Sequence, residues 1–198
     1  MRFIYLSVAL LLIAVSIGCA SVRNVFYHEP HNISIWDARK IHPFGDLSGE
    51  YKQLNAQQSQ LINQLYGQDI SHEGDLIAYY KARKRKGIYG EQGNIFLMQA
   101  KGELGPLDIL VCTTGGHVDE ILIKNNPVLD GKSVIPDEFT QQFIGRSLQN
   151  SWKIAQDPTD LMALPSRIRP ISDYPRTSQE LANAIRKVLI LAKVLEIQ

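Results

Sequence analysis

The pattern of apolar and polar positions after residue 51 predicts two helices. From Lys52 the apolar residues recur with a helical period and stop at Gly67, and glycine is typical of helix C-termini. The residues that carry this period are Leu54, Gln58, Leu61, Ile62 and Leu65. We expect a second helix from Glu73 to Arg85, ending before Gly87.

The pattern then changes to short runs rich in residues that favour strands. These runs are "GNIFLMQA" (93–100), "GPLDILVCTT" (105–114) and "HVDEILIKN" (117–125), and glycines separate them. The tetrapeptide Thr114-Gly115-Gly116-His117 is typical of a tight hairpin, because glycine adopts the positive φ that such turns need. The runs therefore predict an antiparallel meander of at least three strands.

Two further helices are predicted after the meander. One opens at Pro136 and Asp137 and places four apolar residues on one face: Phe139, Phe143, Ile144 and Leu148. The last helix is expected to start at Thr177, which has the capping-box spacing with Glu180. Its apolar stripe consists of Leu181, Ala184, Ile185, Val188, Leu189, Ala192 and Leu195. The predicted class is an α+β domain over residues 52–198, an antiparallel meander flanked by helices.

The first 22 residues have the layout of a secretory signal or a membrane anchor. A basic Arg2 precedes an apolar run, and small residues surround Cys19, as at the cleavage site of a bacterial lipoprotein that is lipidated on this cysteine. Ser16 stands where that signal usually has leucine. Phe3–Val22 is also long enough to cross a bilayer as an uncut helix.

Both interpretations of the N-terminus predict the same location for the rest of the chain. The domain is anchored to the cell membrane and faces the periplasm or another extracytoplasmic space. Residues 23–51 lack periodicity and contain Pro, Gly and Asn, so we expect an extended linker between the anchor and the domain.

Composition restricts the chemistry of the domain. The chain has 198 residues, of which 44% are hydrophobic, and this fits one globular domain. Its net charge of +1 argues against a nucleic-acid partner. The two cysteines, Cys19 and Cys112, are not expected to form an intradomain disulfide. No nucleophile elbow, phosphate-binding loop or zinc motif occurs in the sequence, which argues against a self-contained enzyme.

Three segments in order suggest a family. They are "GELGPLDILVCTTGGHVDEILI", "VIPDEFTQQFIGRS" and "TSQELANAIRKVL". The series resembles the periplasmic FMN-binding domain of bacterial electron-transport proteins. These proteins include flavin-carrying subunits of Rnf-type complexes and sodium-pumping NADH:quinone reductases, and the membrane regulator of nitrous-oxide respiration. The resemblance covers residues 52–190, and "FTQQFIGR" (139–146) fits the family's Phe-Gln-Phe-Gly-basic helix position for position.

The chain departs from this family at the flavin attachment motif. There the family has Ser/Thr-Gly-Ala-Thr, with FMN esterified to the last Thr, whereas this chain has Asp173, Tyr174 and Pro175 in the place of Gly-Ala-Thr. Proline has no hydroxyl group to form the ester. The resemblance thus implies either an electron relay with FMN bound without a covalent bond or by an atypical ester, or an accessory subunit of a redox complex without flavin. A solute-binding or assembly lipoprotein with no redox role is the alternative.

The loop before the last helix, "LPSRIRPISDYPRTSQE" (164–180), is the candidate site. Helix N-termini attract anions, so FMN or another anionic ligand is predicted to bind Arg176, Thr177 and Ser178. The alternative is a proline-stiffened connector whose arginines face solvent or a partner subunit, and the missing acceptor favours this alternative. The predicted partners are the membrane, through the N-terminal segment, and other subunits of a membrane redox complex.

Overall fold

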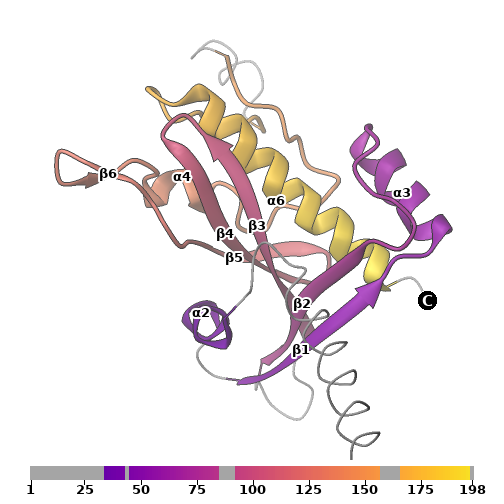
Figure 1. Cartoon of the computed structure of the whole chain (residues 1–198). Coiled ribbons are helices and arrows are strands. Elements are labelled where there is room, and N and C mark those ends of the chain that lie inside the picture. Colours follow the sequence, from indigo (N-terminus) through magenta and orange to yellow (C-terminus); the bar gives the residue numbers. More distant parts are fainter. Residues whose placement is uncertain (1–33, 43–44, 85–91, 157–165, 197–198) are drawn as a thin grey trace, which may run out of the picture. The chain divides into compact units, whose positions relative to one another are not determined.

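The computed structural model describes residues 34–42, 45–84, 92–156 and 166–196 (Figure 1). Within these residues the chain forms a mixed α+β domain, with a five-stranded antiparallel sheet flanked by helices. The strands are β1 (Gly45–Gln53), β2 (Leu76–Lys84), β3 (Gln92–Gly102), β4 (Gly105–Thr114) and β5 (His117–Ile123). Each strand pairs with the next one along the chain. This order confirms the predicted meander and adds two strands to it.

Two tight turns connect the last three strands of the sheet. Thr114 pairs with His117, and the intervening Gly115 and Gly116 have φ angles of 58° and 78°, so the predicted hairpin is confirmed. Between β3 and β4 the pairing ends at Gly102 and Gly105, which leaves a turn of two residues, Glu103 and Leu104. This second turn reaches the C-terminal helix, as described below.

Strand β2 lies where a helix was expected from Glu73 to Arg85, so that prediction is wrong. Tyr79 faces one side of the sheet and stacks on Phe96, with ring centroids 5.5 Å apart. Tyr80 and Ala82 belong to the apolar cluster on the other side. Because both faces of β2 contact apolar side chains, the strand lacks the alternation of polar and apolar residues that identifies a strand in a sequence.

The linker expected over residues 23–51 does not extend to residue 51. Helix α2 (Ile35–Ile41) and strand β1 occupy its second half and belong to the domain. Ser34 caps α2, since its Oγ accepts a hydrogen bond from the Trp36 amide at 3.1 Å. The anchor, Cys19 and the first part of the expected linker lie outside the described residues.

Helix α3 (Ala56–Tyr66) connects β1 to β2. The side chains of Asn55 and Gln58 form a capping box at its start. Gly67 ends the helix in the left-handed conformation, with φ 86°, as the sequence pattern predicts. The helix starts later than expected because Lys52 and Gln53 still pair with β2.

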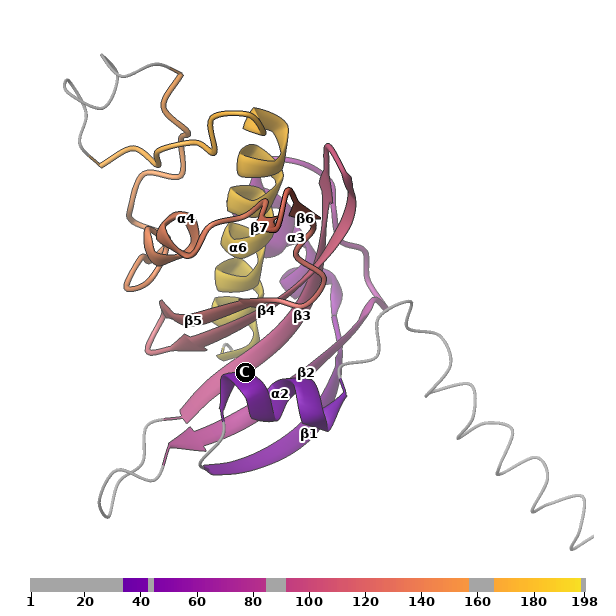
Figure 2. The same ribbon diagram turned by 90° about the vertical axis from the view of Figure 1, so that its left-hand side faces the viewer.

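The long helix α6 (Pro175–Glu196) packs along β3 and β4 and makes the main core with them (Figure 2). The predicted stripe is confirmed, since its members from Leu181 to Ala192 are buried and Leu195 is partly buried. Ala182, Ile190, Leu191 and Val194 are buried as well. The apolar face of α6 is therefore broader than its sequence stripe.

Helix α2 packs on the opposite face of the sheet. Along β4, Ile109 and Val111 belong to the core beneath α6, whereas Leu110 and Cys112 belong to a second cluster with Ala38 and Ile41 of α2. This alternation follows from the period of two residues in a strand. Apolar side chains are thus buried on both faces of the sheet.

The segment between β5 and α6 is mostly irregular. A small hairpin of β6 (Val128–Leu129) and β7 (Lys132–Ser133) precedes helix α4 (Asp137–Gln141). Helix α4 is shorter than the predicted helix, which ran on to Leu148. Phe139 and Phe143 are nevertheless both buried and meet edge to face, with centroids 5.3 Å apart.

Candidate functional site

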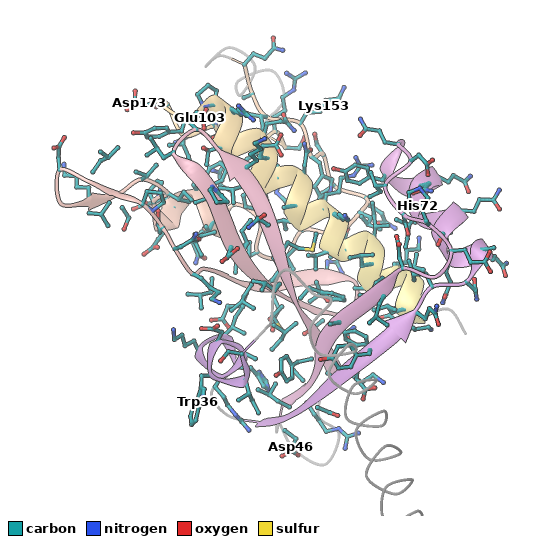
Figure 3. The ribbon with its side chains drawn as sticks, viewed as in Figure 1. Trp36, Asp46, His72, Glu103, Lys153 and Asp173 are labelled. Atoms are coloured by element: carbon teal, nitrogen blue, oxygen red, sulfur yellow. The ribbon has the colours of Figure 1, made fainter. Side chains whose placement is uncertain are left out.

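The start of α6 is the predicted ligand site, and the β3–β4 turn lies against it. Figure 3 shows Glu103 of this turn beside the first turn of the helix. Gly102 permits the close approach, because a Cβ atom at this position would lie 2.8 Å from Thr177 Oγ1. The hairpin and the helix are therefore positioned to exchange hydrogen bonds.

The Glu103 carboxylate accepts hydrogen bonds from the free amides at the start of α6. The Arg176 amide donates to Oε1 at 2.7 Å, and the Thr177 amide donates to Oε2 at 2.6 Å. The Thr177 hydroxyl also donates to Oε2, and it accepts a bond from the Glu103 amide at 3.1 Å. Helix N-termini leave such amides without intrahelical partners, and here a side chain distant in sequence binds them.

These contacts also stabilise the charge of Glu103. Partial desolvation raises the pKa of its carboxyl, but hydrogen bonds from the Thr177 hydroxyl and from backbone amides lower it more. The net pKa lies below the ordinary value, so the carboxylate remains ionised at neutral pH. Its negative charge lies at the positive end of the helix dipole, where an anion is favoured.

The structure brings the three predicted ligand residues together at the first turn of α6, where the backbone amides of Arg176 and Thr177 and the hydroxyls of Thr177 and Ser178 are hydrogen-bonded within the protein and the Arg176 side chain is exposed. Arg176 and Thr177 donate their amides to Glu103. The Ser178 hydroxyl donates to the Tyr174 carbonyl at 2.9 Å and accepts from the Ile171 amide at 2.8 Å. Thr177 and Ser178 are 3% and 0% exposed, so neither hydroxyl is accessible.

The predicted capping box of Thr177 and Glu180 is wrong. The helix begins at Pro175, two residues before the expected start, and Thr177 lies inside its first turn. Proline suits this first position because it has no amide hydrogen to satisfy and its φ is already helical. Glu103 takes the capping role that the sequence pattern assigns to Glu180.

The residues at this site do not fit the phosphate of FMN. A phosphate bound to the first amides of α6 would occupy the place of the Glu103 carboxylate, which carries the same sign of charge. An ester on Thr177 or Ser178 would need a hydroxyl that is buried and already hydrogen-bonded. Pro175, which the resemblance aligns with the FMN acceptor, has no hydroxyl.

Side chains of the Phe-Gln-Phe-Gly-basic segment hold the loop that leads into α6. Gln142 bonds the backbone of Arg169 twice, accepting from its amide at 2.8 Å and donating to its carbonyl at 3.1 Å. Arg146 donates to the carbonyls of Gln142 and Ser151, both at 2.7 Å, and of Ser166 at 3.0 Å. Burial lowers the pKa of the Arg146 guanidinium, which gains these carbonyl partners instead of solvent.

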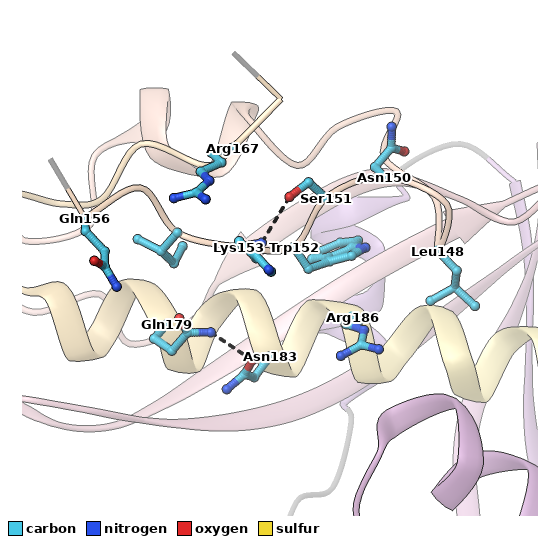
Figure 4. Close-up of a pocket in the computed structure, with 11 residues that line it drawn as sticks. Leu148, Asn150, Ser151, Trp152, Lys153, Gln156, Arg167, Gln179, Asn183 and Arg186 are labelled. Carbon is cyan, nitrogen blue, oxygen red and sulfur yellow. Dashed lines mark hydrogen bonds between the residues drawn. The ribbon is translucent and has the colours of Figure 1, made fainter. Parts of the chain in front are cut away.

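An open groove of about 710 Å³ lies between residues 148–156, Arg167 and α6 (Figure 4). Lys153, Arg167 and Arg186 contribute positive charge, and no described acidic residue lines the groove. The Arg186 guanidinium donates to the Leu65 carbonyl of α3 at 2.9 Å. Arg186 thereby joins α6 to α3, so part of this charge serves the packing of the two helices.

Sequence reasoning placed the start of α6 at Thr177, near the observed start at Pro175, but missed Glu103. One acidic residue in a two-residue turn matches no motif, and it precedes its partners by more than seventy positions. Only the packing of the hairpin on the helix brings them together. The lipidation site predicted at Cys19 lies outside the described residues.

Within the described ranges no three His, Cys, Asp or Glu residues come close enough to hold a metal ion. Of the helices between residues 34 and 196 that the structure describes, none is long and apolar enough to cross a membrane. The chain matches no model of a known protein family, and it has no similar sequence among curated proteins.

Proposed function

We propose that this chain is a membrane-anchored, periplasm-facing, FMN-binding-like domain that acts in or beside a membrane electron-transport complex as a flavin-free accessory subunit. The setting is supported by the apolar N-terminus and by the resemblance of residues 52–190 to the FMN-binding family. The observation that carries the absence of flavin is the carboxylate of Glu103 on the first amides of α6.

A docking role agrees with the surfaces of the domain. Arg169 and Arg176 are exposed near the start of α6, and the β6–β7 hairpin exposes 65% of Val128 and 46% of Leu129. Arginine and apolar side chains on exposed loops suit contacts with neighbouring subunits. The subunit would position such neighbours and carry no electrons itself.

The first test is an absorption spectrum of the full chain purified in detergent from its native membrane, followed by the mass of the denatured chain. We expect no flavin mass and no absorbance at about 450 nm, where oxidised flavins absorb, because the Glu103 carboxylate occupies the amides that would hold the FMN phosphate. A yellow protein, or a flavin ester on Thr177 or Ser178, would show instead that the chain is an electron relay.

The role of the carboxylate is tested separately with inorganic phosphate. Phosphate should raise the melting temperature of Glu103→Ala more than that of the wild type, because the substitution frees the amides of α6. Glu138→Ala, which removes an exposed carboxylate from the first turn of α4, is the matched control. Equal shifts in all three proteins would mean that Glu103 does not exclude an anion.

The accessory role is tested by removing the chain from its native membranes. Electron transfer from donor to quinone should slow, and adding back the wild-type chain should restore it. Unchanged electron transfer would contradict a redox role and favour the alternative, a solute-binding or assembly lipoprotein. A defect in solute uptake or in the assembly of a complex would then identify which of the two functions the chain has.

A further inference from the structure

Helix α2 exposes an aromatic side chain that is not packed in the core. Trp36 is 77% exposed and lies on the outer side of α2 (Figure 3), and Ile35 beside it is 45% exposed. Trp36 has the largest exposed fraction among the large apolar side chains of the described residues. The opposite side of the helix packs Ala38 and Ile41 on the sheet. Apolar side chains that are exposed next to one another, as Ile35 and Trp36 are on α2, form the kind of surface that contacts a partner or a membrane.

The charge on the exposed side of α2 is positive. Lys40 follows Trp36 by one helical turn, and its side chain is 65% exposed. Asp37, the acidic residue in the first turn of α2, is bonded to Lys124 Nζ at 2.7 Å and to Lys40 Nζ at 3.4 Å. A tryptophan next to a lysine on one helix face is typical of a surface that lies in the headgroup region of a bilayer.

Trp36 is also close along the chain to the segment predicted to anchor it. It lies 14 residues after Val22, and an extended chain of that length spans at most about 50 Å. A tether of this length keeps the domain at a high effective concentration near the bilayer, so a weak contact is sufficient to orient it.

We propose that α2 is a membrane-contact element, with the Trp36 indole inserted among lipid headgroups and Lys40 near their phosphates, on the bilayer that holds the N-terminal segment. This inference rests on the anchoring in the proposed function and adds an orientation to it. The end of the sheet that carries α2 faces the membrane, and other parts of the surface remain available to neighbouring subunits.

The experiment uses the full chain reconstituted in vesicles of neutral and anionic phospholipid, with quencher-labelled lipids. The chain has two tryptophans, so Trp152→Phe leaves Trp36 as the reporter. Shallow quenchers should lower its emission roughly twofold and deep quenchers less, with a blue shift relative to detergent, because indoles prefer the interface. If Trp152→Phe does not fold, the difference between the wild type and Trp36→Phe gives the same quantity.

The control moves the indole to a different exposed apolar position. Val128→Trp, in a chain that also carries Trp36→Phe and Trp152→Phe, places it on β6, which lies apart from α2 in both views (Figures 1 and 2). We expect its emission to be unaffected by the labelled lipids. Equal quenching of the two reporters, or no quenching of Trp36, would overturn the inference.

Other results identify other occupants of the surface. A blue shift of Trp36 without lipid that does not depend on concentration would mean that residues 23–33 cover it, and one that grows with concentration would mean a second copy. Either result contradicts lipid contact. Flotation of the vesicles reports anchoring independently: a floating protein without quenching overturns only this inference, whereas a protein that does not float overturns the anchoring as well.

Discussion

The carboxylate of one residue, Glu103, occupies the N-terminus of α6, where a ligand anion could otherwise bind. The free amides at the start of α6 form a site that attracts anions, and the chain supplies its own anion from the β3–β4 turn. The partial positive charge of these amides, which could hold a ligand phosphate, instead binds Glu103 and stabilises the fold. The same contacts lower the pKa of Glu103, so its contribution depends on pH.

Replacing Glu103 by alanine should lower the free energy of unfolding by about 1 kcal/mol at neutral pH, as the loss of a helix cap does. Glu103→Gln should cost less, because its amide oxygen still accepts one bond. The pKa of Glu103 in the folded state lies below its ordinary value of 4.5, so the stabilisation is fully present above that value. It is lost as the pH falls through the folded pKa.

Urea unfolding of the wild type and Glu103→Ala as a function of pH measures this effect. The difference between the two proteins should shrink on acidification below about pH 4.5. Lys101→Ala, an exposed change near the same turn, should give no such pH dependence. A constant difference across this range would mean that the ionised carboxylate is not the stabilising species.

At the scale of elements, the segment from Phe139 to Arg146 joins parts of the chain that secondary structure does not connect. Its aromatic residues enter the core, where Phe143 stacks on Trp152 with centroids 6.0 Å apart. Its polar residues Gln142 and Arg146 bond the loop that leads into α6. The described part of that loop is therefore a fixed connector, held through its backbone.

Arg146→Ala should lower the free energy of unfolding by about 2 kcal/mol, because three carbonyl groups lose a charged donor. Arg146→Lys should recover only part of this, since an ammonium group lacks the forked geometry of guanidinium. Hydrogen exchange should show faster opening of residues 166–171 in both variants.

The matched control for this prediction is Arg169→Ala. It removes an exposed side chain from the same loop and keeps the two backbone bonds to Gln142. Its exchange rates should resemble those of the wild type. If Arg169→Ala loosens the loop as much as Arg146→Ala does, then the loop is held by the positive charge of its side chains and not by the hydrogen bonds from Arg146 to backbone carbonyls.

At the scale of the whole domain, the sheet is covered differently on its two faces. The long helix α6 and the large core lie on one face, whereas the short helix α2 and a small cluster lie on the other. Strand β1 forms one edge and pairs with β2 along its whole length. Residues 35–53 are therefore structural parts of the domain.

A chain that starts at residue 34 should fold, whereas one that starts at residue 52 should not. The second truncation removes β1 and α2, exposes the edge of β2 and uncovers Leu110 and Cys112. Circular dichroism and size-exclusion chromatography would compare the two chains. If the chain from residue 52 is monomeric and unfolds cooperatively, the domain begins at residue 52, as the sequence pattern predicts.

The sequence by itself determined the elements whose signals are local. The stripe of α6, the glycine end of α3 and the Gly115-Gly116 hairpin were all predicted, because side-chain period and positive φ are properties of neighbouring residues. The predicted site at residues 176–178 lies at a helix N-terminus, as expected. The sequence also shows that Pro175, which the resemblance aligns with the FMN acceptor, has no hydroxyl group.

Tertiary structure alone decided the rest. Strand β2 resembled a helix because apolar clusters on both faces remove its alternation, and pairing with β1 and β3 overrides its local pattern. The linker prediction failed for the same kind of reason, since β1 is stabilised by a strand distant in sequence. Glu103 became part of the site only when a hairpin packed on a helix. Such contacts depend on how the elements meet in space, and no spacing along the chain encodes them.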